Sequence, residues 1–257
     1  MLLVNRMLIM SVFTKTLHLI KNEKLGIIST FTLPIAFITV LNMIIEKKIN
    51  LAMHKTPSLV GIHLIEQLLS QNIIYILIVL ILYISFTINI CRFTILGNES
   101  VPSFGISTPR KREFLFFLYS LVLFFIFTLV IITCLLIPII GIFIGFFIIV
   151  VLSARLYFIF PAIAIDDKAS RREAWKISKG YTLSIAIIML LFPYLVTLPF
   201  EILINSVPLF SSFFKSTPAG EITSSVVNLL FYAFNCMLMA MSFKIIKEQH
   251  QEEVLEA

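Results

Sequence analysis

Three polar side chains in otherwise apolar sequence are the first candidates for chemistry. Arg155 is the single charge in the 52-residue run 114–165, and Asn89 and Arg92 lie near the end of an earlier apolar run. An ionisable side chain inside a bilayer usually marks a binding site or an ion pathway. The sequence therefore predicts an intramembrane polar site at Arg155, Asn89 and Arg92. The structural alternative is that Arg155 reaches from the inner end of its span toward Asp166 or the loop after the second span.

A second candidate is a basic stretch after the fourth apolar run. Ser170 and Glu173 form a capping-box pattern, and Gly180 can end a helix, which predicts a helix over about 170–180. One face of this helix is apolar or small, with Ala174, Ile177, Ser178 and Tyr181. An amphipathic helix of this kind lies in the membrane interface. The expected contact with a lipid headgroup or a partner comprises Arg171, Arg172, Trp175, Lys176 and Lys179.

Patterns typical of catalysis are missing from the sequence. It contains no H-E-x-x-H, no G-x-S-x-G and no Walker A loop. No second aspartate pair follows Asp166 and Asp167 at helical spacing, so these two residues do not complete a metal site. His63 and Glu66, with His54 nearby, offer too few ligands for a metal. We therefore expect no catalytic residues, no metal, no cofactor and no enzymatic activity.

Composition then defines the class of protein. The chain has 257 residues, of which 59% are hydrophobic and 13% charged, whereas a soluble domain is roughly 45–50% apolar and about 25% charged. This excludes a soluble enzyme, a disordered chain and a disulfide scaffold. The formal net charge of +6 would suggest nucleic acid on a soluble protein. In a membrane protein it concerns the side of the bilayer, so we expect a lipid partner and no nucleic acid.

The apolar runs predict an all-α, polytopic membrane helix bundle in a single domain, residues 1–257. A spanning helix needs about 20 apolar residues. One helix across 114–165 would be about 78 Å long, so this run must form a hairpin, with Pro138 and Gly141 at its turn. Pro193 and Pro199 interrupt the fifth run. The six expected transmembrane helices are about 25–45, 73–93, 114–136, 141–162, 181–204 and 222–246.

An additional interfacial helix is expected near the N-terminus, over about 8–20. Residues of one face recur there at helical spacing, namely Ile9, Val12, Phe13, Thr16, Leu17 and Ile20. This helix would lead into the first span from the surface of the membrane.

The basic residues predict the orientation. Sixteen of the 20 Lys and Arg residues lie in the N-terminal arm, the second and fourth loops and the C-terminal end. Cytoplasmic segments carry the excess of basic residues, which places both termini in the cytoplasm. We expect a multi-pass protein of a bacterial cytoplasmic (inner) membrane.

Two stretches resemble a known family. The pattern Arg155…Pro161-Ala162…Asp166…Ser170…Ala174-Trp175…Ser178…Gly180, together with Arg92 to Gly97 and Arg112-Glu113-Phe114, resembles the membrane domain associated with glycerophosphoryl diester phosphodiesterases. It is also similar to uncharacterised six-helix bacterial inner-membrane proteins. The resemblance implies the six-helix architecture without an assigned reaction, because the phosphodiesterase chemistry of that family belongs to a separate soluble barrel.

The sequence leaves two main functional hypotheses. The first is a non-enzymatic scaffold, regulator or lipid-interacting module that uses the helix around Trp175 as its cytoplasmic contact surface, with anionic lipids as candidate partners. The alternative is a transporter or permease subunit with a site near Arg155 and the proline-broken fifth span, which requires a cavity at the middle of the membrane.

Overall fold

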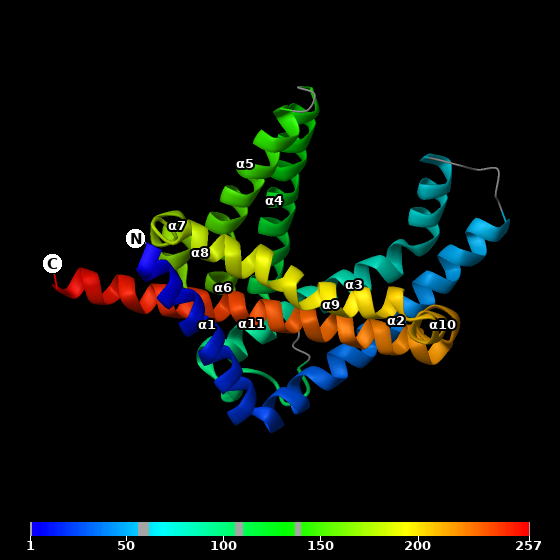
Figure 1. Cartoon of the computed structure of the whole chain (residues 1–257), viewed down its shortest axis with the longest axis horizontal. Coiled ribbons are helices and arrows are strands. Elements are labelled where there is room, and N and C mark those ends of the chain that lie inside the picture. The colour runs from blue at the N-terminus through cyan, green and yellow to red at the C-terminus, as the bar shows by residue number, and fades with distance from the viewer. Residues whose placement is uncertain (1, 56–61, 106–109, 137–139, 257) are drawn as a thin grey trace.

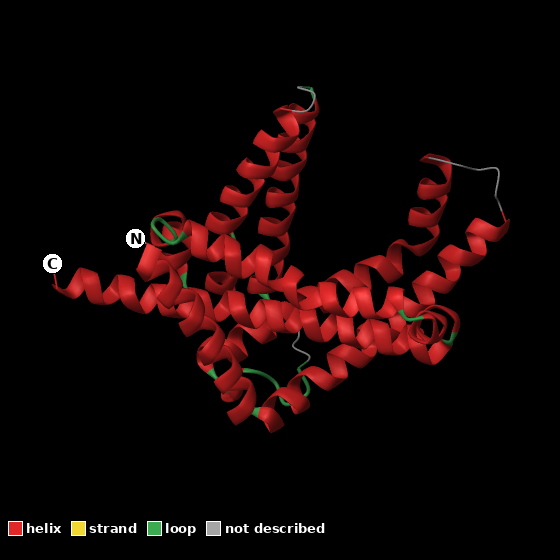
Figure 2. Cartoon of the chain, in the orientation of Figure 1, coloured by secondary structure: helices red, strands yellow, loops and turns green. Residues whose placement is uncertain are grey.

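The structure is a computed structural model, and it describes residues 2–55, 62–105, 110–136 and 140–256. Every regular element within these ranges is helical (Figure 2), which confirms the all-α class. In chain order the elements are α1 (Leu2–Asn22), α2 (Lys24–Lys55), α3 (Ile62–Leu96), the 3-10 turn η1 (Asn98–Ser100), α4 (Lys111–Leu135), α5 (Ile140–Leu156), α6 (Ile159–Ala164), α7 (Lys168–Ile177), α8 (Thr182–Ala186), the π-helical segment η2 (Ile187–Leu191), α9 (Phe192–Ser206), α10 (Pro208–Ser216) and α11 (Pro218–Glu256).

Six segments of the described chain are long and apolar enough to cross a membrane, as the sequence predicts. They are Lys24–Ile49, Asn72–Leu96, Lys111–Leu135, Phe143–Ala164, Thr182–Ser206 and Pro218–Glu252. The predicted turn between the third and fourth segments falls partly on residues 137–139, which lie outside the described residues. Helices α4 and α5 pack against each other on either side of it, in agreement with the expected hairpin.

Helix α11 is the central element of the fold (Figure 1). It has 39 residues and is therefore about 58 Å long. It contributes to all three apolar clusters: Phe243 packs with α1, α5, α7 and α8, Met237 packs with α2 and α3, and Ala240 packs with α3, α4 and α6. The most apolar window of α11 is 67% buried, against 11% for α4. The protein is thus built around its last helix.

The hairpin of α4 and α5 projects away from the other helices (Figure 1). Large apolar side chains are exposed on both of its helices, including Phe124, Leu129, Phe143 and Phe147. Such an area would be a liability in water, whereas hydrocarbon tails solvate it without cost. The exposed apolar surface agrees with the composition in pointing to a lipid environment.

The fourth span is not the single helix over 141–162 that the sequence predicts. Helix α5 ends at Leu156, and α6 begins at Ile159 after a short turn. Proline cannot donate to the carbonyl four residues earlier and clashes with it, and Pro161 stands four residues after Tyr157. The amide of Phe160 turns to the Tyr157 carbonyl instead, at 3.1 Å. The break therefore comes before the proline.

The fifth span is irregular, but not in the way its two prolines suggest. The irregularity is η2, which ends immediately before α9, and Pro193 is the second residue of α9. A π-helical turn shifts the register of the backbone hydrogen bonds. This turn directly precedes α9, in which Pro193 has no backbone N–H to donate to the preceding turn. Pro199 lies inside α9 without ending it.

Helix α1 covers the predicted interfacial segment and begins earlier. Leu8, Val12 and Thr16 are buried, because α1 packs against α11 and α8. Leu17, which the sequence places on the apolar face, is 45% exposed. The predicted face therefore lies only partly inside the protein, and its place at the membrane surface stays a prediction. The helix uses only one edge of its apolar stripe for packing inside the protein.

Helix α7 corresponds to the segment predicted over 170–180 but starts at Lys168. Ser170 therefore lies inside the helix, and its assignment as the capping residue was wrong. Helix α7 ends at Ile177, three residues before the predicted end, and Gly180 lies in the turn that follows, with φ +98°, a conformation that favours glycine. Helix α10, which packs against α9 and α11, has no counterpart among the sequence predictions.

Candidate functional site

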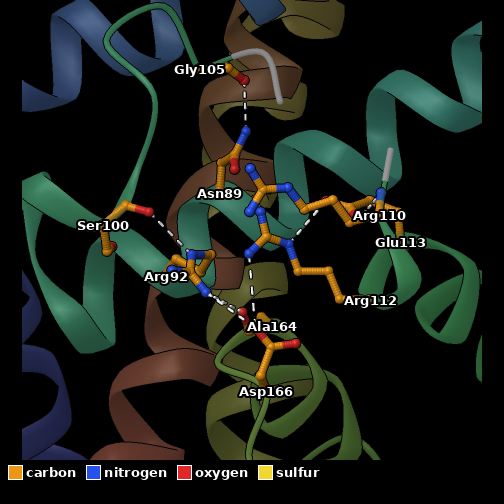
Figure 3. Close-up of polar contacts among 9 residues, drawn as sticks. All are labelled: Asn89, Arg92, Ser100, Gly105, Arg110, Arg112, Glu113, Ala164 and Asp166. Atoms are coloured by element: carbon orange, nitrogen blue, oxygen red, sulfur yellow. Dashed lines mark hydrogen bonds and ion pairs between the residues drawn. The ribbon is translucent and has the colours of Figure 1, made fainter. Parts of the chain in front are cut away.

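A cluster of charges gathers at the C-terminal end of α6 (Figure 3). The amide of Asp167 donates to the Ala162 carbonyl at 2.9 Å, and that of Asp166 donates to the Ile163 carbonyl at 3.1 Å. This pair of bonds is a Schellman motif, whose C′ residue is usually a left-handed glycine. Here the residue is Asp166, with φ +59°. The left-handed conformation strains the backbone of a non-glycine residue, and it places the Asp166 carboxylate at the end of α6.

Arg92 of α3 connects this end to the loop after α3. Its Nε donates to the Ser100 carbonyl at 3.1 Å, and its Nη1 donates to the Ala164 carbonyl at 3.0 Å. The same Nη1 lies 3.7 Å from Oδ2 of Asp166. A cation is favourable at the negative end of a helix. Arg92 thus satisfies carbonyls of two segments at once, through the fork of donors that only arginine offers.

The start of α4 reaches the same carboxylate. Arg112 Nη1 lies 3.9 Å from Asp166 Oδ2, and its Nε donates to Glu113 Oε1 at 3.0 Å. The other oxygen of Glu113 accepts the backbone amide of Arg110 at 2.7 Å. Glu113 therefore caps the first turn of α4 while it neutralises Arg112. Both side chains are buried, whereas that of Asp166 is 66% exposed.

Two lysines of α11 complete the arrangement. Lys247 Nζ donates to Oδ2 of Asp167, and Lys244 Nζ donates to the Ile95 carbonyl at 3.2 Å. The two adjacent aspartates consequently face different helices, since Asp166 meets α3 and α4 and Asp167 meets α11. The cluster joins four elements that are far apart in sequence. The cluster can hold these helix ends together through ion pairs and hydrogen bonds, and it leaves charged groups at the surface.

Asn89 lies one turn before Arg92 and bonds the loop after α3, whereas its buried Oδ1 has no donor among the described residues. Its Nδ2 donates to the Gly105 carbonyl at 2.7 Å. Gly105 has φ +65°, and a Cβ at this position would lie 1.8 Å from the Thr30 carbonyl oxygen. Only glycine fits there, and Asn89 holds it against α2. The buried amide therefore supports a close packing of loop and helix.

The structure separates Arg155 from the other two members of the predicted polar site. Arg155 Nε donates to Thr182 Oγ1 at 3.3 Å, and its Cζ lies 4.5 Å from the centroid of the Trp175 ring. The backbone carbonyl of Arg155 accepts Ser178 Oγ at 3.5 Å. Asp166 is paired with Arg92 and Arg112, and not with Arg155. The partners of Arg155 thus lie in α7 and α8, whereas those of Asn89 and Arg92 lie in the loop after α3 and at the end of α6, and the predicted polar site stays a prediction.

Helix α7 divides into a docked face and a free face. Ala174, Ile177 and Ser178 are buried, as the sequence predicts, and they pack with α1, α5 and α11. Arg172, Lys176 and Lys179 are exposed, and Trp175 is 44% exposed. We call Arg172, Lys176 and Lys179 the α7 basic surface. The side chain of Arg171, also predicted to take part, lies outside the described side chains.

Sequence reasoning did not assign Arg112, Glu113, Asp167 and Lys247 to a site. Their signal was present, since each lies within a few residues of the end of an apolar run, where charges of different spans can meet. Within the described ranges no group of three or more His, Cys, Asp or Glu residues is placed to hold a metal ion. The side chains of His63 and Glu66 lie outside the described side chains.

Comparison with known proteins identifies no relative for this chain. No protein family, no curated protein and no solved structure matches it. The resemblance to the phosphodiesterase-associated membrane domain therefore stays a prediction. The function has to be argued from the residues and their geometry alone.

Proposed function

We propose that this chain is a non-enzymatic, six-span protein of a bacterial cytoplasmic membrane that binds anionic lipid headgroups through the α7 basic surface. The observation that carries the proposal is the division of α7 into two faces. One face is anchored in the apolar core by Ala174 and Ile177, and the other presents Arg172, Lys176 and Lys179 outward. Basic residues at this position are attracted to anionic lipids by about 1 kcal/mol each.

The contact between Arg155 and Trp175 supports this role. A cation over an indole face contributes about 0.5–1 kcal/mol at exposed sites. Arg155 also bonds Thr182 of α8, so this residue of α5 contacts both α7 and α8. A surface helix held in this way presents its charges in a fixed arrangement. It therefore loses little conformational entropy when a headgroup binds.

The proposal includes an orientation with both termini in the cytoplasm. Its support is that the segments expected on the inner side contact one another: Arg92 reaches the end of α6, and Lys247 reaches Asp167. Around this end the basic residues outnumber the acidic ones: Arg92, Arg110, Arg112, Lys244 and Lys247 accompany Glu113, Asp166 and Asp167 (Figure 3 shows the part from α3, α4 and α6). A local excess of positive charge is what the cytoplasmic side of a membrane protein carries.

A non-enzymatic role fits the engagement of the acidic residues. Asp166 and Asp167, which a lipid-directed enzyme would use, lie against Arg92, Arg112 and Lys247. Glu173 is exposed on α7. General acid–base catalysis needs a side chain that is free to exchange a proton with the substrate within hydrogen-bond reach, and the two aspartates are engaged with cations instead.

A transporter is the second candidate, and one observation favours it. A cavity lies between spans two, three, four, five and six, with Thr87, Met189 and Asn235 among its lining residues. Arg155, the residue expected to act there, is not among them. The cavity supports the transporter hypothesis, and the absence of Arg155 from its lining weakens it.

The lipid proposal is tested by native mass spectrometry of the protein purified from membranes containing phosphatidylglycerol and phosphatidylcholine. The triple variant Arg172→Ala, Lys176→Ala, Lys179→Ala should retain at least about tenfold less phosphatidylglycerol than the wild type, in line with the loss of about 1 kcal/mol per residue. The matched control is Lys15→Ala, Lys21→Ala, Lys24→Ala, which removes the same charge from exposed positions of α1 and α2. Equal losses in both variants, or no loss in either, would refute a specific role of α7.

A further inference from the structure

A cavity of about 460 Å³ lies between α3, α4, α6, η2 and α11, away from the charge cluster and from α7. Its volume falls in the range of small-molecule binding sites. Most of its lining is apolar. The apolar lining residues are Phe116, Leu123, Phe124, Phe127, Phe160, Met189 and Met239.

The polar part of the lining is concentrated on α3 and α11. Thr87 Oγ1 donates to the Tyr83 carbonyl at 2.8 Å, which uses its single proton. The Tyr232 hydroxyl, 2.6 Å from Thr87 Oγ1, must therefore be the donor of the bond between them. The Cys236 thiol lies beside both hydroxyls. These groups satisfy one another in a chain.

Asn235 also lines the cavity, but its Oδ1 takes no part in these hydrogen bonds. Its Oδ1 is buried, and no donor within the described part of the protein reaches it. A buried acceptor without a donor is unfavourable, and native proteins rarely tolerate one without a ligand or water. In a span, the donor has to come from a molecule in the cavity. The amide thus points to a ligand that carries a hydrogen-bond donor.

The lining contains no Asp, Glu, Lys or Arg, so a charged headgroup would be unpaired in it and costly to bury. Phe124, on the α4 side of the lining, is 64% exposed. Since α4 is one of the apolar spans, the cavity opens toward the region of the lipid chains, and its ligand arrives from the bilayer. The ligand is therefore neutral and mainly apolar.

We infer that this cavity binds a neutral amphiphile consisting of an apolar chain and a hydroxyl group. The hydroxyl donates to Asn235 Oδ1, and the chain lies along the phenylalanines of α4 and α6. A second cavity, lined by Glu46, Glu221 and Asn228 among other residues, shares Tyr232 with the first. The hydroxyl end of the ligand consequently lies toward Tyr232 and this polar cavity, with the chain directed toward Phe124.

The test uses the full-length protein in phosphatidylcholine nanodiscs with a photoreactive 16-carbon alcohol that carries a diazirine in its chain. Labelling should be saturable, and unlabelled hexadecanol should compete at least tenfold better than hexadecane. Asn235→Leu should remove this tenfold difference. Asn205→Leu, the same change at an exposed position of α9 that lines neither of these cavities, should retain it.

A second variant keeps the test decisive if Asn235→Leu does not fold. Ser120→Phe fills the cavity from α4, where Ser120 bonds only the carbonyl of its own helix at 2.8 Å, and it should abolish saturable labelling. Equal competition by hexadecane and hexadecanol in the wild type would mean that lipid chains fill the cavity without recognition. That result, or unchanged labelling of both cavity variants, overturns the inference.

Discussion

The guanidinium of Arg155 lies over the indole ring of Trp175, with 4.5 Å between Cζ and the ring centroid. This pair joins the end of a spanning helix to the amphipathic helix α7. Arg155, the one charge in its apolar run, is therefore directed at α7 and does not line the cavity between α3, α4, α6, η2 and α11. The relationship gives both residues a positioning role for the α7 basic surface.

The first prediction concerns the coupling of these two residues. In a double-mutant cycle with Arg155→Gln and Trp175→Leu, unfolding in mixed micelles should show a coupling energy of about 0.5–1 kcal/mol. The control cycle pairs Trp175→Leu with Arg92→Gln, whose partners lie in the α6 cluster, and its effects should add. A zero coupling for the first pair would show that the stacking does not hold α7.

The second prediction concerns Arg92. Lysine at this position offers one ammonium in place of the fork that reaches the Ser100 and Ala164 carbonyls, so Arg92→Lys should cost about 1–3 kcal/mol in free energy of unfolding. Arg110→Lys, at an exposed position of the same region, should change it by less than about 0.5 kcal/mol. Similar effects of the two substitutions would contradict the bridging role of Arg92.

The third prediction separates the backbone of Asp166 from its charge. Asp166→Ala and Asp166→Gly remove the same carboxylate, but only glycine tolerates φ +59° without strain. Asp166→Gly should therefore be more stable than Asp166→Ala by about 1 kcal/mol in thermal or chemical unfolding. Because the carboxylate is largely exposed, its ion pairs should contribute little. If the alanine variant equals the glycine variant, the left-handed conformation is not required.

A fourth prediction compares two glycines with positive φ. Gly105→Ala would place a Cβ 1.8 Å from the Thr30 carbonyl oxygen, whereas Gly97, with φ +90°, has no atom within 4 Å of its would-be Cβ. We expect Gly105→Ala to cost at least about 3 kcal/mol or prevent folding, and Gly97→Ala to cost about 1 kcal/mol. The yield and unfolding of the two purified variants measure this difference, and an equal tolerance would contradict the close packing of the loop on α2.

The sequence was sufficient for the features that depend on composition along the chain. Six apolar runs became six helices of spanning length, and the alternation of small and basic residues located the two faces of α7. It was insufficient where distant residues meet. The pairing of Asp166 with Arg92 and Arg112 depends on how α3, α4 and α6 converge, and no local pattern encodes this convergence.

Local rules also failed where tertiary packing overrides them. The stripe from Ile9 to Ile20 indicated an interfacial helix but not its packing inside the protein, where Leu8 is buried and Leu17 is 45% exposed. The prolines of the fifth span indicated breaks at their own positions, yet the irregular turn lies before Pro193 and spares Pro199. No sequence pattern indicated that the buried oxygen of Asn235 lies in a cavity without a donor, and the structure shows it.

The most direct test of the lipid-binding proposal uses the only tryptophan of the chain, Trp175. Its fluorescence is measured in nanodiscs in which either phosphatidylglycerol or phosphatidylcholine carries brominated chains, at equal mole fractions. Brominated phosphatidylglycerol should quench Trp175 more strongly, and this preference should disappear in the Arg172→Ala, Lys176→Ala, Lys179→Ala variant. Equal quenching by both lipids in the wild type, or no quenching by either, would contradict the assignment of α7 as a surface for anionic lipids.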